Sequence, residues 1–230
     1  IAFRRSNSQR WQSSTPPDDT TPRRRMSNRR RPTSKKPFRR RPVDLKKIEW
    51  LKRVTEHFVA HTKPGTLTGG KWHEVVSLLK AWSNFRKVDG QTPVRMEELL
   101  KVLVEERRSG NNAVQLSIDL YNTVLNAWAC AALFRTVKDP ILASQRAREI
   151  LVTVQEMYEQ EVAQRIEESG RSGSELTIDA PKPNRESFYI VMHVVSRVEE
   201  ALVTRRLLAW MEFLHKSQRN VDAKPNRLHY

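Results

Sequence analysis

From Pro42 onward, the apolar residues of this chain recur every three or four positions, which is the spacing of one face of an α-helix. Clusters of glycine, proline and asparagine interrupt this periodicity at fairly regular intervals. No segment shows the clear alternation of apolar and polar residues that indicates a half-buried β-strand. The sequence therefore predicts an all-α fold.

Seven helices are expected between these interruptions, and the fifth is unusually long. They cover about residues 43–60, 72–85, 93–109, 119–134, 140–166, 188–195 and 201–214. The valine-rich segment Val191–Val198 also suits a strand, because β-branched residues favour extended backbone. Trp82, Trp128 and the single cysteine, Cys130, lie on apolar helix faces, which predicts that they are core residues.

Basic residues concentrate in the first 41 positions, which we call the basic tail. Fourteen of the 42 Lys and Arg residues lie in this tail with only two of the 26 acidic residues, so it carries +12 of the net charge of +16. Its low apolar content predicts disorder. Its arginine triplets are expected to bind phosphates without sequence preference. These residues are Arg23, Arg24, Arg25, Arg29, Arg30, Arg31, Arg39, Arg40 and Arg41.

The composition of the tail allows two interpretations. Arginine and serine are abundant and acidic residues are rare, which is typical of a mitochondrial or plastid transit peptide. A solvated basic arm that binds any polyanion, such as ribosomal RNA, would have the same composition. Because most of the positive charge belongs to the tail, total charge alone does not predict RNA binding by the helical part.

Two segments of the helical part end in the same three residues. Lys182-Pro183-Asn184 precedes Phe188 by four residues, and Lys224-Pro225-Asn226 precedes Tyr230 by the same interval. The segment Asp119–Ala129 has an aromatic residue followed by Asn, Thr and two aliphatic residues. This order and the Lys-Pro-Asn endings are similar to those of the pentatricopeptide repeat, and the chain resembles that family over residues 118–230.

The resemblance implies a right-handed α-solenoid of stacked helix-turn-helix repeats that follows a disordered tail. Residues 1–41 would be the tail, 42–117 a helical region with a degenerate repeat, 118–226 two repeats, and 227–230 the start of another. The two repeats are longer than the roughly 34 residues of a compact two-helix unit. We expect the extra length of the first repeat in the fifth helix and in the loop 168–180.

The resemblance also implies the residues that would contact RNA bases. In this family the residue after the aromatic and the residue after Lys-Pro form a base-reading pair, which gives Asn122 with Asn184 and Tyr189 with Asn226. In the degenerate unit the corresponding residues are Val76 and Ser117, and Val76 cannot hydrogen-bond. Asn184 and Asn226 also precede helices, where asparagine is a preferred N-cap, so capping is the alternative role for both.

The expected function is therefore the binding of single-stranded RNA during its processing, stabilisation or translation in an organelle. The expected organelle is a mitochondrion, and a plastid is the alternative. The alternatives are a tetratricopeptide-type protein scaffold and a structural subunit of an organellar ribosome. The possible protein partners are ribosomal or other organellar proteins. Neither catalysis, cofactor nor metal is expected, because the histidines are scattered and no phosphate-binding glycine loop occurs. Charges interrupt every helix, so no membrane association is expected.

Overall fold

The computed structural model describes residues 44–172, 178–217 and 219–226, without the side chains of 168–172. Within these residues the regular structure consists of seven α-helices and one 3-10 turn, with no strand, so the all-α prediction is confirmed. The described residues form one compact unit. The basic tail, with its nine triplet arginines and its expected disorder, and the segment 227–230 lie outside the described residues.

The helices begin and end close to the predicted positions. They are α1 (Leu45–His61), α2 (Gly69–Ser83), α3 (Thr92–Arg108), α4 (Ile118–Leu133), α5 (Pro140–Ser172), α6 (Arg185–Val198) and α7 (Ala201–Lys216), followed by the 3-10 turn η1 (Val221–Ala223). At 33 residues α5 is unusually long, as predicted. The strand alternative for Val191–Val198 is wrong, because these residues form the second half of α6.

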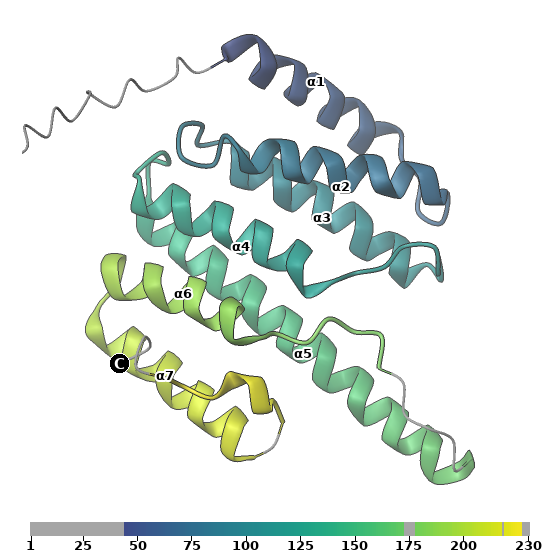
Figure 1. Cartoon of the computed structure of the whole chain (residues 1–230), viewed down its shortest axis with the longest axis vertical. Coiled ribbons are helices and arrows are strands. Elements are labelled where there is room, and N and C mark those ends of the chain that lie inside the picture. Colours follow the sequence, from purple (N-terminus) through teal and green to yellow (C-terminus); the bar gives the residue numbers. More distant parts are fainter. Residues whose placement is uncertain (1–43, 173–177, 218, 227–230) are drawn as a thin grey trace, which may run out of the picture. The chain divides into compact units, whose positions relative to one another are not determined.

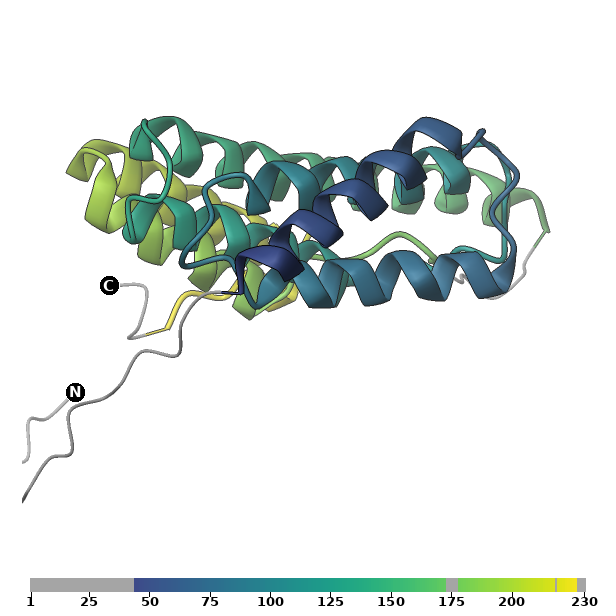
Figure 2. The same cartoon turned by 90° about the horizontal axis from the view of Figure 1, so that it is seen from above.

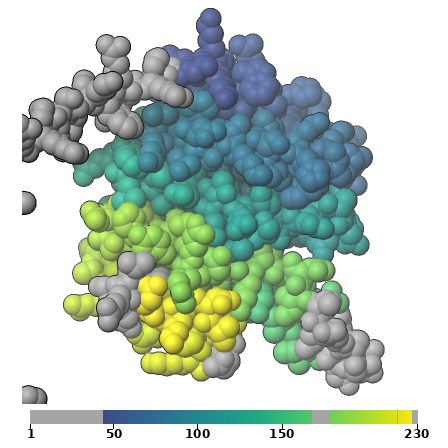
Figure 3. All heavy atoms as spheres, in the orientation of Figure 1, coloured from purple at the N-terminus to yellow at the C-terminus, as the bar shows by residue number. Residues whose placement is uncertain are grey.

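Each helix packs only on helices that are near to it along the chain. The described helices that contact one another are separated by at most one other helix, so α4 contacts α2, α3, α5 and α6 but neither α1 nor α7. Figure 1 shows this order as successive hairpins from α1 to α7, and the colours in Figure 3 follow one another in the same sequence. Figure 2 shows the protein from the end of the array at which α1 lies, and in this view α1 crosses the other helices obliquely.

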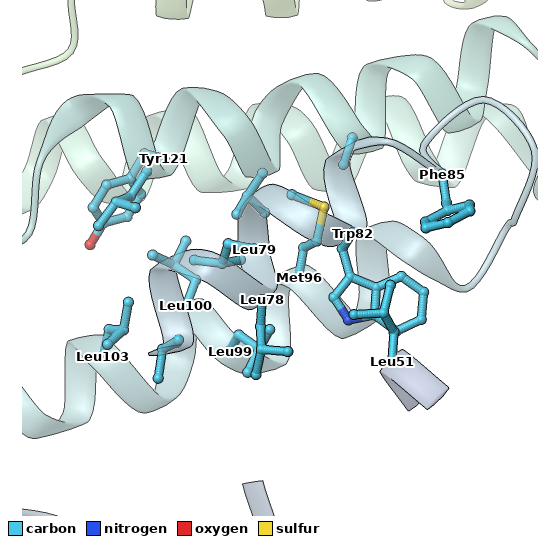
Figure 4. Packing of buried hydrophobic residues seen from close by; sticks show 14 of the residues in the cluster. Leu51, Leu78, Leu79, Trp82, Phe85, Met96, Leu99, Leu100, Leu103 and Tyr121 are labelled. Atoms are coloured by element: carbon cyan, nitrogen blue, oxygen red, sulfur yellow. The ribbon is translucent and has the colours of Figure 1, made fainter. Parts of the chain in front are cut away.

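Two hydrophobic cores meet at α4. The first joins α1, α2 and α3 to one side of α4 and includes Val154 of α5, and its fully buried side chains include Trp82, Met96 and Leu99 (Figure 4). The second joins the other side of α4 to α5, α6 and α7. Trp128 packs against both cores and Cys130 is buried, so the predicted core positions of Trp82, Trp128 and Cys130 are confirmed.

The chemistry of α4 explains its central position. Four of its buried residues are alanines, and such small side chains allow neighbouring helices to approach closely. The hairpin loops also pack tightly at one end of the helices. A Cβ atom placed on Gly90, before α3, would lie 2.2 Å from the carbonyl oxygen of Thr136, in the loop after α4. Only glycine therefore allows these two loops to meet.

Candidate functional site

The structure brings together the first predicted base-reading pair. Asn122 lies in the first turns of α4, and Asn184 stands directly before α6. Although 62 residues separate them in the sequence, the Nδ2 amide of Asn122 lies 3.3 Å from Oδ1 of Asn184, to which it donates a hydrogen bond. The contact forms because α4 and α6 pack side by side, with their amino-terminal ends at the same edge.

Asn184 is the N-cap of α6, as the alternative interpretation of this residue predicted. Its Oδ1 accepts a hydrogen bond from the backbone N–H of Ser187 at 3.0 Å, and its own N–H donates to Ser187 Oγ at 3.1 Å. This reciprocal arrangement is a capping box, which satisfies two backbone donors at the start of a helix. Capping fixes the position of Asn184 at the junction between α5 and α6.

Ser187 connects the cap to Asn122. Its hydroxyl lies 2.7 Å from Oδ1 of Asn122 and 3.1 Å from Oδ1 of Asn184. A hydroxyl has a single proton, so the shorter contact, to Asn122, is the better donor bond. Sequence reasoning missed Ser187. The signal that was available is its position three residues after an N-cap asparagine, where a side chain can return to the cap backbone.

The base-reading role that the resemblance implies for Asn122 would require its side chain to be accessible. Only 5% of this residue is exposed, because α6 and Ser187 cover it. Its Oδ1 is bound by Ser187 and its Nδ2 by Asn184, so both ends of the amide have partners inside the protein. Asn184 is half-buried, and its Nδ2 donates to no atom of the described residues. At this junction Asn184 is therefore the residue with unused hydrogen-bonding capacity.

The other predicted site residues lie in different surroundings. Tyr189 is 39% exposed on α6 and stacks on His193 with ring centroids 5.9 Å apart, and Asn226 is half-buried after η1. Val76 packs against the first core, and Ser117 is an exposed residue that precedes α4 without a side-chain capping bond. The degenerate unit therefore lacks a pair like that of Asn122 and Asn184.

A second asparagine anchors the next Lys-Pro-Asn segment. Asn220 is fully buried, and its Nδ2 donates to the side-chain oxygen of Gln155 at 2.9 Å and to the carbonyl oxygen of Pro183 at 2.8 Å. Lys182 pairs with Asp222 at 2.8 Å. The chain that follows α7 is thus held against the segment that precedes α6. Sequence reasoning missed Asn220, because its partners are 65 and 37 residues away.

The first helices of the hairpins differ in charge along this edge. Helix α4 contains no Lys or Arg and has Asp119 in its first turn. Helix α2 carries Lys71 near its start, and α6 begins with Arg185. A surface that binds a nucleic-acid backbone through these helices would therefore receive little positive charge from α4.

Within residues 44–167, 178–217 and 219–226, no three His, Cys, Asp or Glu side chains lie together in a way that could hold a metal ion. Of the helices described, none is both long and apolar enough to cross a membrane. Comparison of the chain with protein-family models, with curated proteins and with solved structures gave no match.

Proposed function

We propose that this chain is a helical-repeat protein of the pentatricopeptide type that binds single-stranded RNA in a mitochondrion or plastid. The observation that carries the proposal is the junction at which Asn122 and Asn184 meet after Lys182-Pro183. The nearest-neighbour packing of the hairpins supports an α-solenoid, because stacked repeats contact only adjacent units, and the resemblance implies its right hand. No catalytic role, cofactor or membrane attachment is part of the proposal.

In this proposal Asn184 makes the base contact and Asn122 orients it. The Oδ1 atom of Asn184 is occupied by the Ser187 N–H and by Asn122, which leaves its Nδ2 to donate to a base. Sequence-specific RNA readers bind unstacked single-stranded bases through such side-chain contacts. Because Asn122 is buried, we expect one weak base preference at this junction.

The experiment that tests the proposal compares a substitution at the junction with one elsewhere on the surface. Asn184→Ser keeps a good N-cap residue but removes the amide donor. Loss of one hydrogen bond corresponds to roughly 3- to 10-fold in affinity. The unchanged chain is first tested with 12-nucleotide rA, rC and rU. We expect the loss of affinity for whichever of these homopolymers it binds most tightly. Fluorescence anisotropy gives the affinities, and urea denaturation verifies that the variant is folded.

Asn112→Ala is the matched control, because Asn112 is an exposed asparagine whose partner is Arg107 rather than a residue of the junction. This variant should bind all three homopolymers as the unchanged chain does. A chain without any preference among the homopolymers, or a preference that survives Asn184→Ser, would contradict base contact at this site.

One observation favours a second candidate function. The absence of Lys and Arg from α4 is more typical of a helical scaffold, or of a structural subunit of an organellar ribosome, than of an RNA-binding groove. Ultraviolet crosslinking of the full-length protein in its organelle separates the two candidates. Recovery of RNA attached to peptides of α4 or α6 supports RNA binding by the repeats, whereas recovery of crosslinked proteins without RNA supports the scaffold.

A further inference from the structure

A groove lies between α3 and α5. Both helices pack on α4, yet their Cα atoms nowhere come within 8 Å of each other. The space between them has a volume of about 630 Å³, which is within the range of small-molecule sites. Its walls are mainly apolar. The apolar residues are Val59, Leu100, Val102, Val104, Ile150 and Met157.

Tyr121 of α4 lines this groove. Only 3% of the residue is exposed, and Figure 4 shows its side chain at the end of the first core where Leu100 and Leu103 lie. Among the described residues, the hydroxyl donates to the Met157 sulfur at 4.0 Å, a weak acceptor at a long distance. Burial raises the pKa of Tyr121 to about 12, against the opposing effect of the Arg108 charge. The hydroxyl is therefore a protonated donor without a strong acceptor.

Most charges around the groove are neutralised within the protein. Arg146 and Lys101 both bind Glu97, and Glu98 binds Arg95. Two charged lining residues, Glu105 and Arg108, have no ion pair among the described residues, and both are exposed. Of these two, Arg108 is the one that acts on Tyr121. Beside its apolar wall the groove thus offers the Tyr121 hydroxyl as a donor, together with two exposed charges that have no ion pair among the described residues, the cation Arg108 and the anion Glu105.

The groove continues into a polar pocket. This second space, of about 430 Å³, shares Arg108 and Met157 with the groove and is also lined by Arg107, Gln160 and Gln164. Arg107 is paired with Asp179 at 3.1 Å. Arg108 therefore stands where the apolar groove meets a polar one. A ligand that fits both would be apolar at one end and polar at the other, and Arg108 could bind an anionic group at the boundary.

From this arrangement we propose that the groove binds a medium-chain fatty acid. The alkyl chain would lie between α3 and α5, against Val102 and Ile150. The carboxylate would accept a hydrogen bond from the Tyr121 hydroxyl and pair with Arg108. A nucleobase fits less well, because the apolar wall leaves the polar atoms of a base edge without partners. The proposal does not rest on RNA binding.

Titration calorimetry tests how the affinity of the full chain depends on the length of the fatty acid. The ligands are sodium octanoate, decanoate and dodecanoate, each below its micelle concentration. Each methylene that enters the groove should raise the affinity roughly 4-fold. Sodium acetate is the control ligand, because its binding measures how much of the affinity comes from general anion binding by the basic tail. An affinity that does not rise from octanoate to decanoate would overturn the proposal, as would the absence of any binding beyond that of acetate.

Two substitutions test the head group. Arg108→Gln should weaken decanoate binding about 10-fold or more, since a charge-assisted contact is lost, but should leave 1-decanol binding unchanged. Tyr121→Phe keeps the ring and removes the hydroxyl, so it should weaken decanoate binding without changing the urea midpoint. The control is Arg53→Gln, which removes an exposed arginine of α1 whose partner is Glu49.

The comparison with the control decides the outcome. If Arg108→Gln and Arg53→Gln weaken decanoate binding equally, the carboxylate is held by general charge attraction and the assigned head-group site is wrong. If both Arg108→Gln and Tyr121→Phe leave decanoate binding unchanged, the ligand lies elsewhere and the proposal fails. Neither result bears on the homopolymer preferences that test RNA binding.

Discussion

Arg146 of α5 binds Glu97 of α3 through two of its guanidinium nitrogens, although the two residues are 49 positions apart. The carboxylate of Glu97 also accepts hydrogen bonds from the indole N–H of Trp128 at 3.1 Å and from Lys101 at 3.0 Å. Its side chain is 8% exposed. One buried carboxylate thereby connects three consecutive helices from two hairpins. This cluster holds α3 and α5 in place across the groove between them.

Replacing Glu97 with glutamine is expected to destabilise the protein at neutral pH. Removing one partner of a buried ion pair leaves the other charge without compensation. Arg146 is 37% exposed and keeps Glu149 as a partner, so the loss should be below that of a fully buried pair, at about 2 kcal/mol. Urea denaturation at pH 7 measures it. The exposed pair of Glu49 and Arg53 supplies the control Glu49→Gln, which should change the free energy of unfolding by less than about 0.5 kcal/mol.

The stability difference between the unchanged chain and Glu97→Gln is expected to depend on pH. Burial raises the pKa of Glu97, hydrogen bonds from Arg146 and Lys101 lower it, and the net effect is a pKa below the ordinary value of 4.5. A carboxylate with a lowered pKa stabilises the folded state above its unfolded pKa, and this stabilisation is lost as pH falls through the folded pKa. The difference between the unchanged chain and Glu97→Gln should therefore shrink below about pH 4. A difference that stays constant from pH 7 to pH 3.5 would contradict the lowered pKa.

Gly90 provides a prediction about the hairpin loops. A Cβ atom at this position would lie 2.2 Å from the Thr136 carbonyl oxygen and 3.0 Å from its carbonyl carbon, so a backbone segment would have to move. Gly90→Ala should lower stability by about 1–3 kcal/mol, as overpacking of a tight contact does. Gly70→Ala is the matched control, because a Cβ there meets nothing within 4 Å and α2 should gain up to about 1 kcal/mol. Thermal unfolding of the two variants should shift in opposite directions.

The helices could be predicted from the sequence because their signals are local. Periodic apolar residues and nearby breakers predicted both ends of α4 to within one residue and the start of α5, whereas α5 continues six residues beyond its predicted end. The same local signals left Val191–Val198 ambiguous. The burial of Phe188, Val191 and Val195 against the second core decides in favour of the helix, and that packing involves residues far away in the sequence.

The candidate site could be predicted only in part. The resemblance placed Asn122 and Asn184 together, and they do meet. It did not predict the burial of Asn122, because the covering residue, Ser187, belongs to the next unit of the chain. Glu97 and Arg146 are unremarkable as isolated charges in the sequence. Their pairing depends on the relative positions of α3 and α5, which no local pattern contains.

Ser187 is expected to stabilise the junction between the repeats. Ser187→Ala removes the hydroxyl that donates to Asn122 and accepts from the Asn184 N–H, which leaves a buried amide oxygen unsatisfied. The loss should be about 1–3 kcal/mol in the free energy of unfolding. Ser196→Ala on the same helix is the control, since its hydroxyl is exposed and bonds only the carbonyl of His193, and it should stay within about 0.5 kcal/mol. Equal effects of the two substitutions in urea denaturation would show that the junction contributes no particular stability.

The basic tail, according to our proposal, dominates the salt dependence of RNA binding. Residues 1–41 contain 14 Lys and Arg residues, whereas α4 contains none. On single strands each phosphate contact contributes roughly 0.7 to the slope of log affinity against log salt. Replacing the nine triplet arginines with glutamine should therefore flatten the slope, measured by anisotropy with 12-nucleotide rU between 50 and 200 mM salt. Replacement with lysine keeps the charge and should preserve the slope. If the glutamine variant had the same slope as the unchanged chain, the phosphate contacts would lie on the helical repeats. Because α4 has no Lys or Arg, these contacts would then have to come from Lys71, Arg185 and their neighbours on α2 and α6.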